Sequence, residues 1–344
     1  MLNLCMEVTR APLAPEPLWP QLGGFEFQAA QPADLPEIAR FLDRAHPDDP
    51  CDLALLKRQD SFRLPGEPFW RVLARHRGEL VAVAEVTVPR SENYPGWWHI
   101  GLDLLPELVE APLARTLLRS AEAFALAQGS TTLLARVKAH WRELGLFQAA
   151  GYREHDRMWN SGLDLRTLDF AAFAPHEARA RASGVRLEPL STLEPGEGGQ
   201  LSEAGQRRLY ALIAALLRDV PSTQAISVWP FELWQQRYLP HLKHPEGVWL
   251  AVAPEGEWVG LSELHLENAT RPGTVQNGLT GVLPPWRGQG LALALKLAAA
   301  RAALQRGYTQ ARTNNHSVNR AMLAVNEKLG FVRESATVTV RKEV

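Results

Sequence analysis

Two stretches of the chain repeat at the same distance, and this repeat limits the folds that are open to it. Residues 104–106 match residues 282–284, and residues 150–154 match residues 329–334, at an offset of about 178 residues in both places. A fixed offset of this size indicates a duplicated domain. With 344 residues, the chain has room for two domains of ~150 to 180 residues each.

A glycine-rich turn lies between a strand-like run ending at 283–284 and an alanine- and leucine-rich helix. Its sequence is Arg287-Gly288-Gln289-Gly290-Leu291-Ala292. The backbone N–H groups of such a turn converge on a phosphate, and the positive end of the helix dipole lies behind them. The turn therefore predicts an anion site, although its spacing fits neither the phosphate loop nor the dinucleotide fingerprint.

The first copy of the repeat lacks this turn. Its counterpart is Val109-Glu110-Ala111-Pro112-Leu113-Ala114, which has no glycine. The carboxylate of Glu110 would repel a pyrophosphate, and the bulkier residues would keep the backbone away from it. We therefore expect the first domain to be a degenerate copy that does not bind the cofactor.

The repeat and the composition together predict the domain boundaries. We expect an extended N-terminal arm at 1–22, a degenerate domain at 23–166, a small and charged linker at 167–183, and a cofactor-binding domain at 184–344. In the second half the pattern alternates between strands and helices. The expected strands are 184–190, 248–252, 258–266, 276–283 and 309–312, and the expected helices are 207–217, 230–238, 291–305 and 317–329, the last with Ser317 as its N-cap and Gly330 as its stop.

The residues after the turn carry a family resemblance. Residues 313–331 read Thr-Asn-Asn-His-Ser-Val-Asn-Arg-Ala-Met-Leu-Ala-Val-Asn-Glu-Lys-Leu-Gly-Phe. Together with the turn, they resemble the Gcn5-related N-acetyltransferase (GNAT) superfamily, which binds acetyl-coenzyme A with an Arg/Gln-x-x-Gly-x-Gly/Ala turn and has a later helix ending in Gly-Phe. The asparagine-rich version looks like the tandem bacterial type that includes mycothiol-synthase-like proteins. The strong match covers roughly residues 275–334.

The resemblance implies a fold and a set of cofactor contacts. The fold is α/β, with two tandem GNAT-like domains that are each a mixed, mostly antiparallel sheet flanked by helices. The pantetheine of acetyl-CoA would bind the backbone at Val282 and Thr280, and the amides of residues 287–291 would hold the pyrophosphate. Arg287 has two roles open to it: its guanidinium contacts phosphate, or it only presents its N–H.

The asparagines of the last helix are further cofactor candidates. Asn319 and Asn326 are seven residues apart and lie beside an apolar stripe, so their amides need partners. A pantetheine arm carries amide groups that supply them, and Asn315 belongs to the same set. The alternative is that these side chains bond neighbouring backbone or cap local turns.

Acetyl transfer to an amine requires a group that takes up the amine proton. In the superfamily this base is often a Glu on a central strand, and Glu263 is the candidate by position, with His265 as its substitute. Surface alternation of the strand is the other interpretation of Glu263. Many relatives have a Tyr that protonates the departing thiolate, and here that position is Asn326. A coenzyme A thiolate is a tolerable leaving group, by comparison with a free Cys pKa of about 8.5.

The acceptor pocket would be lined by residues 218–230. Asp219 is a candidate partner for a cationic amine, and Trp229, Trp234 or Trp286 for an apolar wall. These tryptophans are equally suited to a core, and Asp219 to a turn.

Composition sets limits on the partners. The chain has 37 basic and 38 acidic residues, so net charge predicts no attraction to nucleic acid or to membranes. Two cysteines, Cys5 and Cys51, argue against a disulfide framework, and the N-terminal residues do not form an export leader, so we expect a cytoplasmic protein. The spacing of His241 and His244 suggests a metal site, but no cysteine or carboxylate framework accompanies it, and we expect none.

Two classes of function follow. The first is an acetyl-CoA-dependent N-acetyltransferase that acts on a small-molecule amine with its C-terminal domain, as a monomer or homodimer. The alternative is a non-catalytic acyl-CoA-binding or interaction module, favoured by the missing Tyr.

Overall fold

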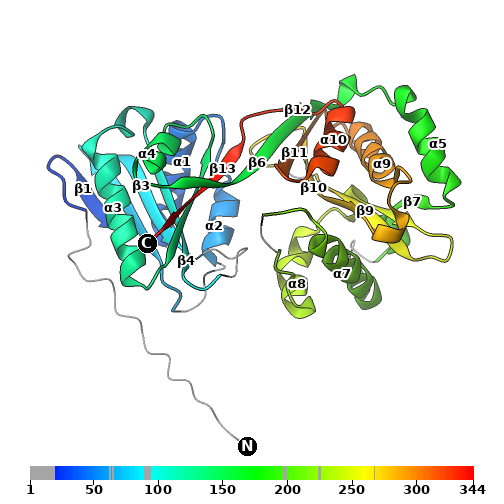
Figure 1. Ribbon diagram of the computed structural model, residues 1–344, viewed down its shortest axis with the longest axis horizontal. Helices are drawn as coiled ribbons and strands as arrows, with labels where there is room; N and C mark the ends of the chain where they lie inside the picture. Colours follow the sequence, from blue (N-terminus) through cyan, green and yellow to red (C-terminus); the bar gives the residue numbers. More distant parts are fainter. Residues whose placement is uncertain are drawn as a thin grey trace, which may run out of the picture. The chain divides into compact units, whose positions relative to one another are not determined.

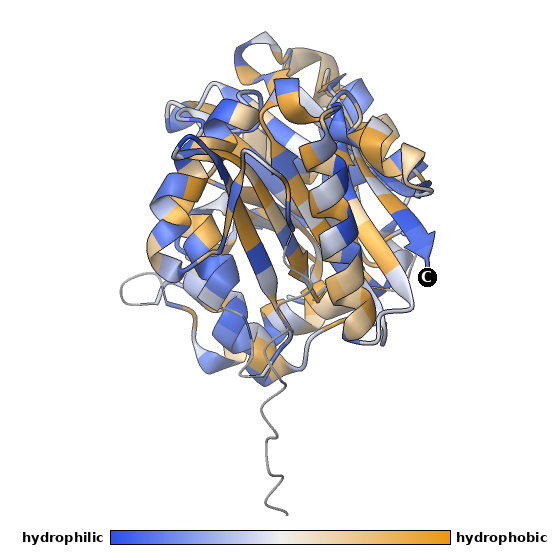
Figure 2. Ribbon diagram, turned by 90° about the vertical axis from the view of Figure 1, so that its left-hand side faces the viewer, coloured by the Kyte–Doolittle hydropathy of each residue, from blue (hydrophilic) through white to orange (hydrophobic). Residues whose placement is uncertain are grey.

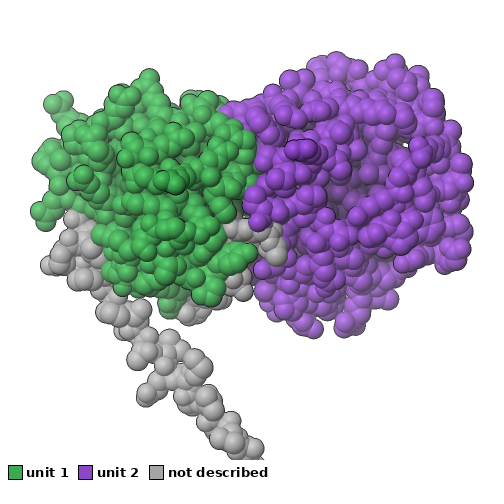
Figure 3. All heavy atoms as spheres, viewed as in Figure 1, with its two compact units in different colours: residues 1–157, 337–344 green, residues 158–336 purple. Residues whose placement is uncertain are grey.

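The computed structural model describes residues 20–61, 63, 66–88, 94–196, 200–223, 226–266 and 268–344. Most of the expected N-terminal arm lies outside these residues. The chain forms two compact units, coloured separately in Figure 3: unit 1 consists of residues 1–157 and 337–344, and unit 2 of residues 158–336. This division differs from the expected boundaries at both ends, because unit 1 takes its last strand from residues after 336.

The strands of unit 1 lie in the order β1-β2-β3-β4-β5-β13 (Figure 1). All neighbours pair antiparallel except β4 and β5, which are parallel. Its elements are β1 (Glu26–Ala29), α1 (Leu35–Ala45), α2 (Leu53–Ser61), β2 (Trp70–His76), β3 (Glu79–Thr87), β4 (Trp97–Leu104), α3 (Pro112–Ala127), β5 (Thr132–Lys138), α4 (Glu143–Ala149) and β13 (Thr337–Glu343).

The larger core cluster of unit 1 lies between the sheet and α3, and a smaller one lies between the sheet and α1. Leu113, Leu117 and Ala121 recur at helical spacing on α3, and all three are fully buried against strand residues such as Ile100 and Val338. Figure 2 shows this pattern as hydrophobic colour in the strands and along one side of the helices. α3 has Ala111 as its N-cap with φ −71°, so the start of this helix has no left-handed glycine turn.

The strands of unit 2 lie in the order β6-β11-β10-β9-β8-β7, and β12 also pairs with β6. The boundary of the units falls within β6, after Arg157. Its elements are β6 (Arg153–Asp164), α5 (Ala174–Ala182), β7 (Arg186–Pro189), α6 (Leu190–Leu193), α7 (Glu203–Arg218), α8 (Phe231–Arg237), β8 (Val248–Val252), β9 (Trp258–His265), β10 (Thr274–Val282), α9 (Leu291–Gln305), β11 (Gln310–His316), α10 (Arg320–Lys328) and β12 (Val332–Arg333).

The predicted mixed, mostly antiparallel sheet flanked by helices is confirmed in the described residues, and three local expectations are corrected. β11 continues to His316 instead of ending at Arg312. The last helix therefore begins at Arg320, and its N-cap is Asn319 instead of Ser317, because the Asn319 side chain accepts a hydrogen bond from Met322 N at 3.2 Å. The expected linker contains a helix, α5, that packs against α9.

The central strands of unit 2 separate after three residue pairs. β10 and β11 are parallel neighbours only at Thr274–Gln276 and Gln310–Arg312. Beyond these pairs β10 stays with β9, with a bulge between Asn277 and Thr280, while β11 stays with β6 along its whole length. The sheet therefore opens between residues 277–282 and 313–316.

Candidate active site

The glycine turn has the geometry of an anion site. Gly288 and Gly290 have φ of +76° and +83°, in the left-handed region that residues with a Cβ rarely adopt. Gly290 is the N-cap of α9, so the first N–H groups of a 15-residue helix point out of the turn without partners in the helix. Free amides and the positive helix end together favour a phosphate here.

The helix that replaces the expected linker supports this turn. Arg179 of α5 donates from Nη2 to the carbonyl oxygen of Gly288 at 2.8 Å. The carbonyl oxygen of His176 lies 3.6 Å from where a Cβ on Gly290 would be. α5 is therefore a structural part of the unit that contains the turn.

A pocket of about 320 Å³ occupies the opening between β10 and β11. One wall comes from the two separated strands, a second from the end of α7 and the chain after it, and a third from the start of α10. The lining residues are Met158, Leu217, Val220, Pro221, Ser222, Ile226, Gly278, Leu279, Thr280, Lys296, Thr313, Asn314, Asn315, His316, Asn319 and Met322. The lining is polar on the strand side and apolar on the α7 side.

Glu263 lies directly behind this pocket, at the bulge of β10. It is 5% exposed, and both of its carboxylate oxygens have donors: Tyr238 O–H on one and Leu279 N on the other, the latter at 2.9 Å. Burial, and then the charge of Glu263 and its hydrogen bond, raise the pKa of Tyr238 well above its ordinary value, so Tyr238 remains a donor. Glu263 is thus not the surface residue that strand alternation would allow.

The other copy of the repeat offers an internal comparison. Glu85 on β3 stands 178 positions before Glu263 (263 − 85). There the carboxylate forms an ion pair with Arg71, which also binds Asp60 through two contacts of 2.8 Å. In unit 2 the residue paired with Glu263 on the neighbouring strand is Val248, where unit 1 pairs Arg71 with Glu85.

Gly278 brings the two candidate bases together. His265 Nε2 and Glu263 Oε2 lie 2.7 and 2.8 Å from where a Cβ on residue 278 would be. We expect Gly278→Ala to fold, because the clashing atoms are the ends of side chains that can move, but to displace both groups from their positions beside residue 278. Acyl transfer should fall at least tenfold while the melting temperature changes little. Gly101→Ala, where the nearest atom is at 3.6 Å, is the matched control. Full activity of Gly278→Ala would show that neither group needs this position.

The asparagines form a connected set. Asn326 is 2% exposed and donates from Nδ2 to Asn315 Oδ1 at 2.6 Å. Its own Oδ1 is buried and has no partner in the structure, which marks an acceptor that a ligand donor or a water can satisfy. Asn315 and Asn319 line the pocket, although Asn319 also caps α10.

Several predicted contacts have other partners. Arg287 donates from Nε to the carbonyl of Val282 at 2.9 Å and forms an ion pair of 2.8 Å with Asp219. The Val282 carbonyl is therefore already an acceptor, whereas Thr280 lines the pocket. Gln289 and Ala292 are half-buried beside the turn.

The two predicted acceptor contacts lie outside the pocket. Asp219 forms an ion pair with Arg287. Trp229 is 36% exposed, and its carbonyl accepts from Tyr210 O–H at 2.8 Å. The pocket wall on this side instead consists of the apolar residues from α7 and the chain after it. Trp234 is a core residue, and Trp286 packs against a buried cluster.

Sequence reasoning missed Lys296 and His316. Lys296 is 4% exposed and donates to Asn277 Oδ1 at 3.0 Å, and burial lowers its pKa to about 7. His316 is 6% exposed and accepts from Val318 N at 3.1 Å through Nδ1. A signal for Lys296 was present: it is the single charge in the apolar run 291–300.

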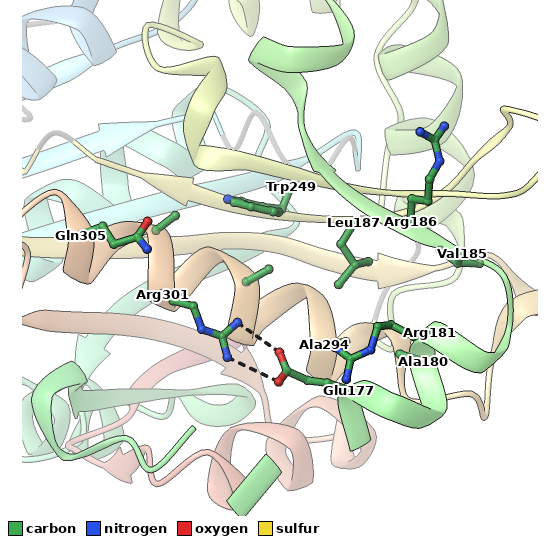
Figure 4. Close-up of a pocket in the computed structure, with 12 residues that line it drawn as sticks. Glu177, Ala180, Arg181, Val185, Arg186, Leu187, Trp249, Ala294, Arg301 and Gln305 are labelled. Atoms are coloured by element: carbon green, nitrogen blue, oxygen red, sulfur yellow. Dashed lines mark hydrogen bonds and ion pairs between the residues drawn. The ribbon is translucent and has the colours of Figure 1, made fainter. Parts of the chain in front are cut away.

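A second pocket, of about 470 Å³, lies on the other side of α9 (Figure 4). Its floor is made of α9 alanines, with Trp249 and Leu187 above them and the Arg301–Glu177 ion pair at one side, where the contacts are 3.1 and 3.4 Å. It contains neither the opening of the sheet nor the free amides of α9. The pocket between β10 and β11 is therefore the candidate site.

The described residues contain neither a membrane-spanning helix nor a cluster of metal ligands. Within the ranges given above, no helix has both the length and the apolar character needed to cross a bilayer. In the same part of the chain, no three His, Cys, Asp or Glu side chains gather as ligands for a metal ion.

Comparison with known proteins agrees with this geometry. Residues 212–331 match the model of the "Acetyltransferase (GNAT) family". No curated protein matched the sequence significantly. A GCN5-related N-acetyltransferase from Sphaerobacter thermophilus has 21% identity and a TM-score of 0.69 over 94% of this chain and 96% of its own. A tandem GNAT protein from the clavulanic acid biosynthesis pathway has 18% identity and a TM-score of 0.68 over 93% and 98%.

The matched residues lie within unit 2 and include the glycine turn, the opened strands and the asparagine helix. The likeness to solved structures extends over both units and establishes the fold. We conclude that residues 212–331 form a domain of the GNAT family and that the chain has the tandem two-domain fold of the GNAT proteins it resembles.

Proposed function

We propose that this protein is an N-acetyltransferase that uses unit 2 to move an acetyl group from acetyl-CoA to a small-molecule amine. The observation that carries the proposal is one continuous arrangement: a left-handed glycine turn with free helix amides, followed by parallel strands that separate around a pocket. The turn suits the pyrophosphate, and the opening suits the pantetheine and the thioester.

The proposed reaction is direct attack. The amine nitrogen forms a bond to the thioester carbonyl carbon, the carbon–sulfur bond breaks, and coenzyme A leaves as a thiolate. The pocket holds the two groups in contact, which lowers the barrier because the step becomes effectively unimolecular. Asn326 stands where relatives have a Tyr, so the leaving thiolate takes its proton from solvent in this proposal.

Glu263 is the proposed acceptor of the amine proton, with His265 as the alternative beside the same glycine. Glu263→Gln keeps the shape of the side chain and an oxygen for Leu279 N, but removes the charge. We expect kcat to fall about 100-fold with unchanged acetyl-CoA affinity, because general-base contributions are of this size. His265→Gln is the companion variant, and a larger loss there than in Glu263→Gln would move the role to His265.

The first test is calorimetry of acetyl-CoA binding to the whole chain. One site per chain is expected, because the first copy of the turn lacks both glycines, and the N-cap of its helix, Ala111, is not left-handed. A screen of amines with thiol detection then follows. Binding without turnover on any amine would favour a non-catalytic acyl-CoA-binding module, and no binding would reject both functions.

A further inference from the structure

Lys296 is a buried cation for which the described residues provide no carboxylate partner. It projects from α9 toward the sheet, where it contacts Asn277 Oδ1 at 3.0 Å and the Phe331 ring at 5.4 Å. A buried ammonium without a counter-ion is costly, which is why its pKa falls to about 7. Leu or Met would be favoured at such a position by packing alone.

The buried ammonium of Lys296 lies next to the pocket between β10 and β11. Asn277 is the first residue of β10 after the last pair with β11, so Lys296 Nζ lies where the two strands begin to separate. Lys296 is also one of the residues that line the pocket between these strands. The ammonium therefore lies at the inner end of the opening.

The rest of the lining of this pocket contains no negatively charged side chain. Of its 16 residues, Lys296 is the one Lys or Arg, and none is Asp or Glu. Glu263 lies behind Gly278 with both oxygens occupied, and Asp219 is held by Arg287 outside the pocket. A ligand that carried only positive charge would find no counter-ion in this lining, whereas a carboxylate would find one.

We propose that Lys296 binds a carboxylate of the substrate, held at the inner end of the opening between β10 and β11. The inference rests on the proposed function and specifies its substrate class. The carboxylate has two possible sources: a dicarboxylic acyl group such as succinyl on coenzyme A, or the carboxylate of an amino-acid acceptor. In either case the anion provides the counter-ion that the protein itself does not supply.

The test compares matched ligands with and without the carboxylate. One arm measures succinyl-CoA against acetyl-CoA with a single amine, and the other measures an α-amino acid against its amide with a single acyl donor. We expect one arm to show a preference in kcat/KM of at least tenfold for the carboxylate, and the arm that shows it identifies the source. In Lys296→Gln, which keeps a donor for Asn277, the ratio should fall to about 1.

A second readout separates binding from folding. Lys296→Met should melt at a higher temperature than the natural protein, because it removes an uncompensated buried charge. A purely structural lysine would instead make this variant less stable. Unchanged preference in Lys296→Gln, or no preference in either arm while acetyl-CoA still binds and turns over, would overturn the inference and leave the proposed function intact. Failure of every donor to bind would remove the proposed function itself.

Discussion

Gly290→Glu should abolish acetyl-CoA binding in calorimetry, with a loss of at least 100-fold in affinity. Two effects act together. The residue has φ +83°, where a side chain is strained, and the new carboxylate would lie at the positive end of α9, where the pyrophosphate is expected. The new charge repels the ligand, and the new side chain keeps the ligand away from the backbone amides. We therefore expect a larger loss of binding free energy than of folding free energy.

The control is Gly307→Glu, at the other end of the same helix. Gly307 has φ +86° and open space around its Cβ position, so the backbone strain is matched while the anion site is untouched. We expect this variant to lose stability comparably and to bind acetyl-CoA normally. Equal loss of binding in both variants would mean that helix strain, and not the turn, determines affinity.

Truncation after Ala336 should unfold unit 1. The removed segment contains β13, which pairs with β5 at seven consecutive positions from Thr337–Lys138 to Glu343–Thr132. Val338 and Val340 are fully buried in the core of unit 1. Their burial alone is worth about 1.5 to 3 kcal/mol each, to be compared with a total domain stability of about 5 to 15 kcal/mol. The edge of β5 would also lose its partners.

Hydrogen exchange measures this outcome region by region. Protection should disappear in β2 to β5 and persist in β8 to β11, although the deletion is next to unit 2 in the sequence. Val338→Asp should reproduce the loss without changing the chain length, and Thr337→Asp, at a half-buried position, should not. Intact protection of β5 in the truncated chain would contradict the role of β13.

The sequence predicted the parts of this structure that depend on local signals. The repeat indicated two units, and the glycines of the turn located the start of α9 at Leu291, where the structure has it. The place of the last strand, β13, in unit 1 was not predictable in this way. Repeat spacing shows where similar segments lie, but not which strand each segment pairs with. Pairing of residues 337–343 with 132–138 is a contact across about 200 positions, and no local pattern encodes it.

In the candidate site, too, features that depend on local sequence were predictable and features that depend on long-range contacts were not. The turn and the pair Glu263 and His265 could be found from local sequence, because each lies in a recognisable strand or turn. The partners of Arg287 and Asp219 could not, since 68 positions separate these two residues. Lys296 was visible as a lone charge in an apolar run, but its meaning depends on the opening of the sheet, which only the three-dimensional pairing of β10 reveals.

The place of β13 in unit 1 also bears on how the protein is made. A ribosome completes residues 1–157 and then all of 158–336 before it synthesises β13, the last strand of unit 1. Throughout that interval β5 remains an unpaired edge, the kind of surface that aggregates or recruits chaperones. The half of the molecule that is translated first is therefore the half that finishes folding last.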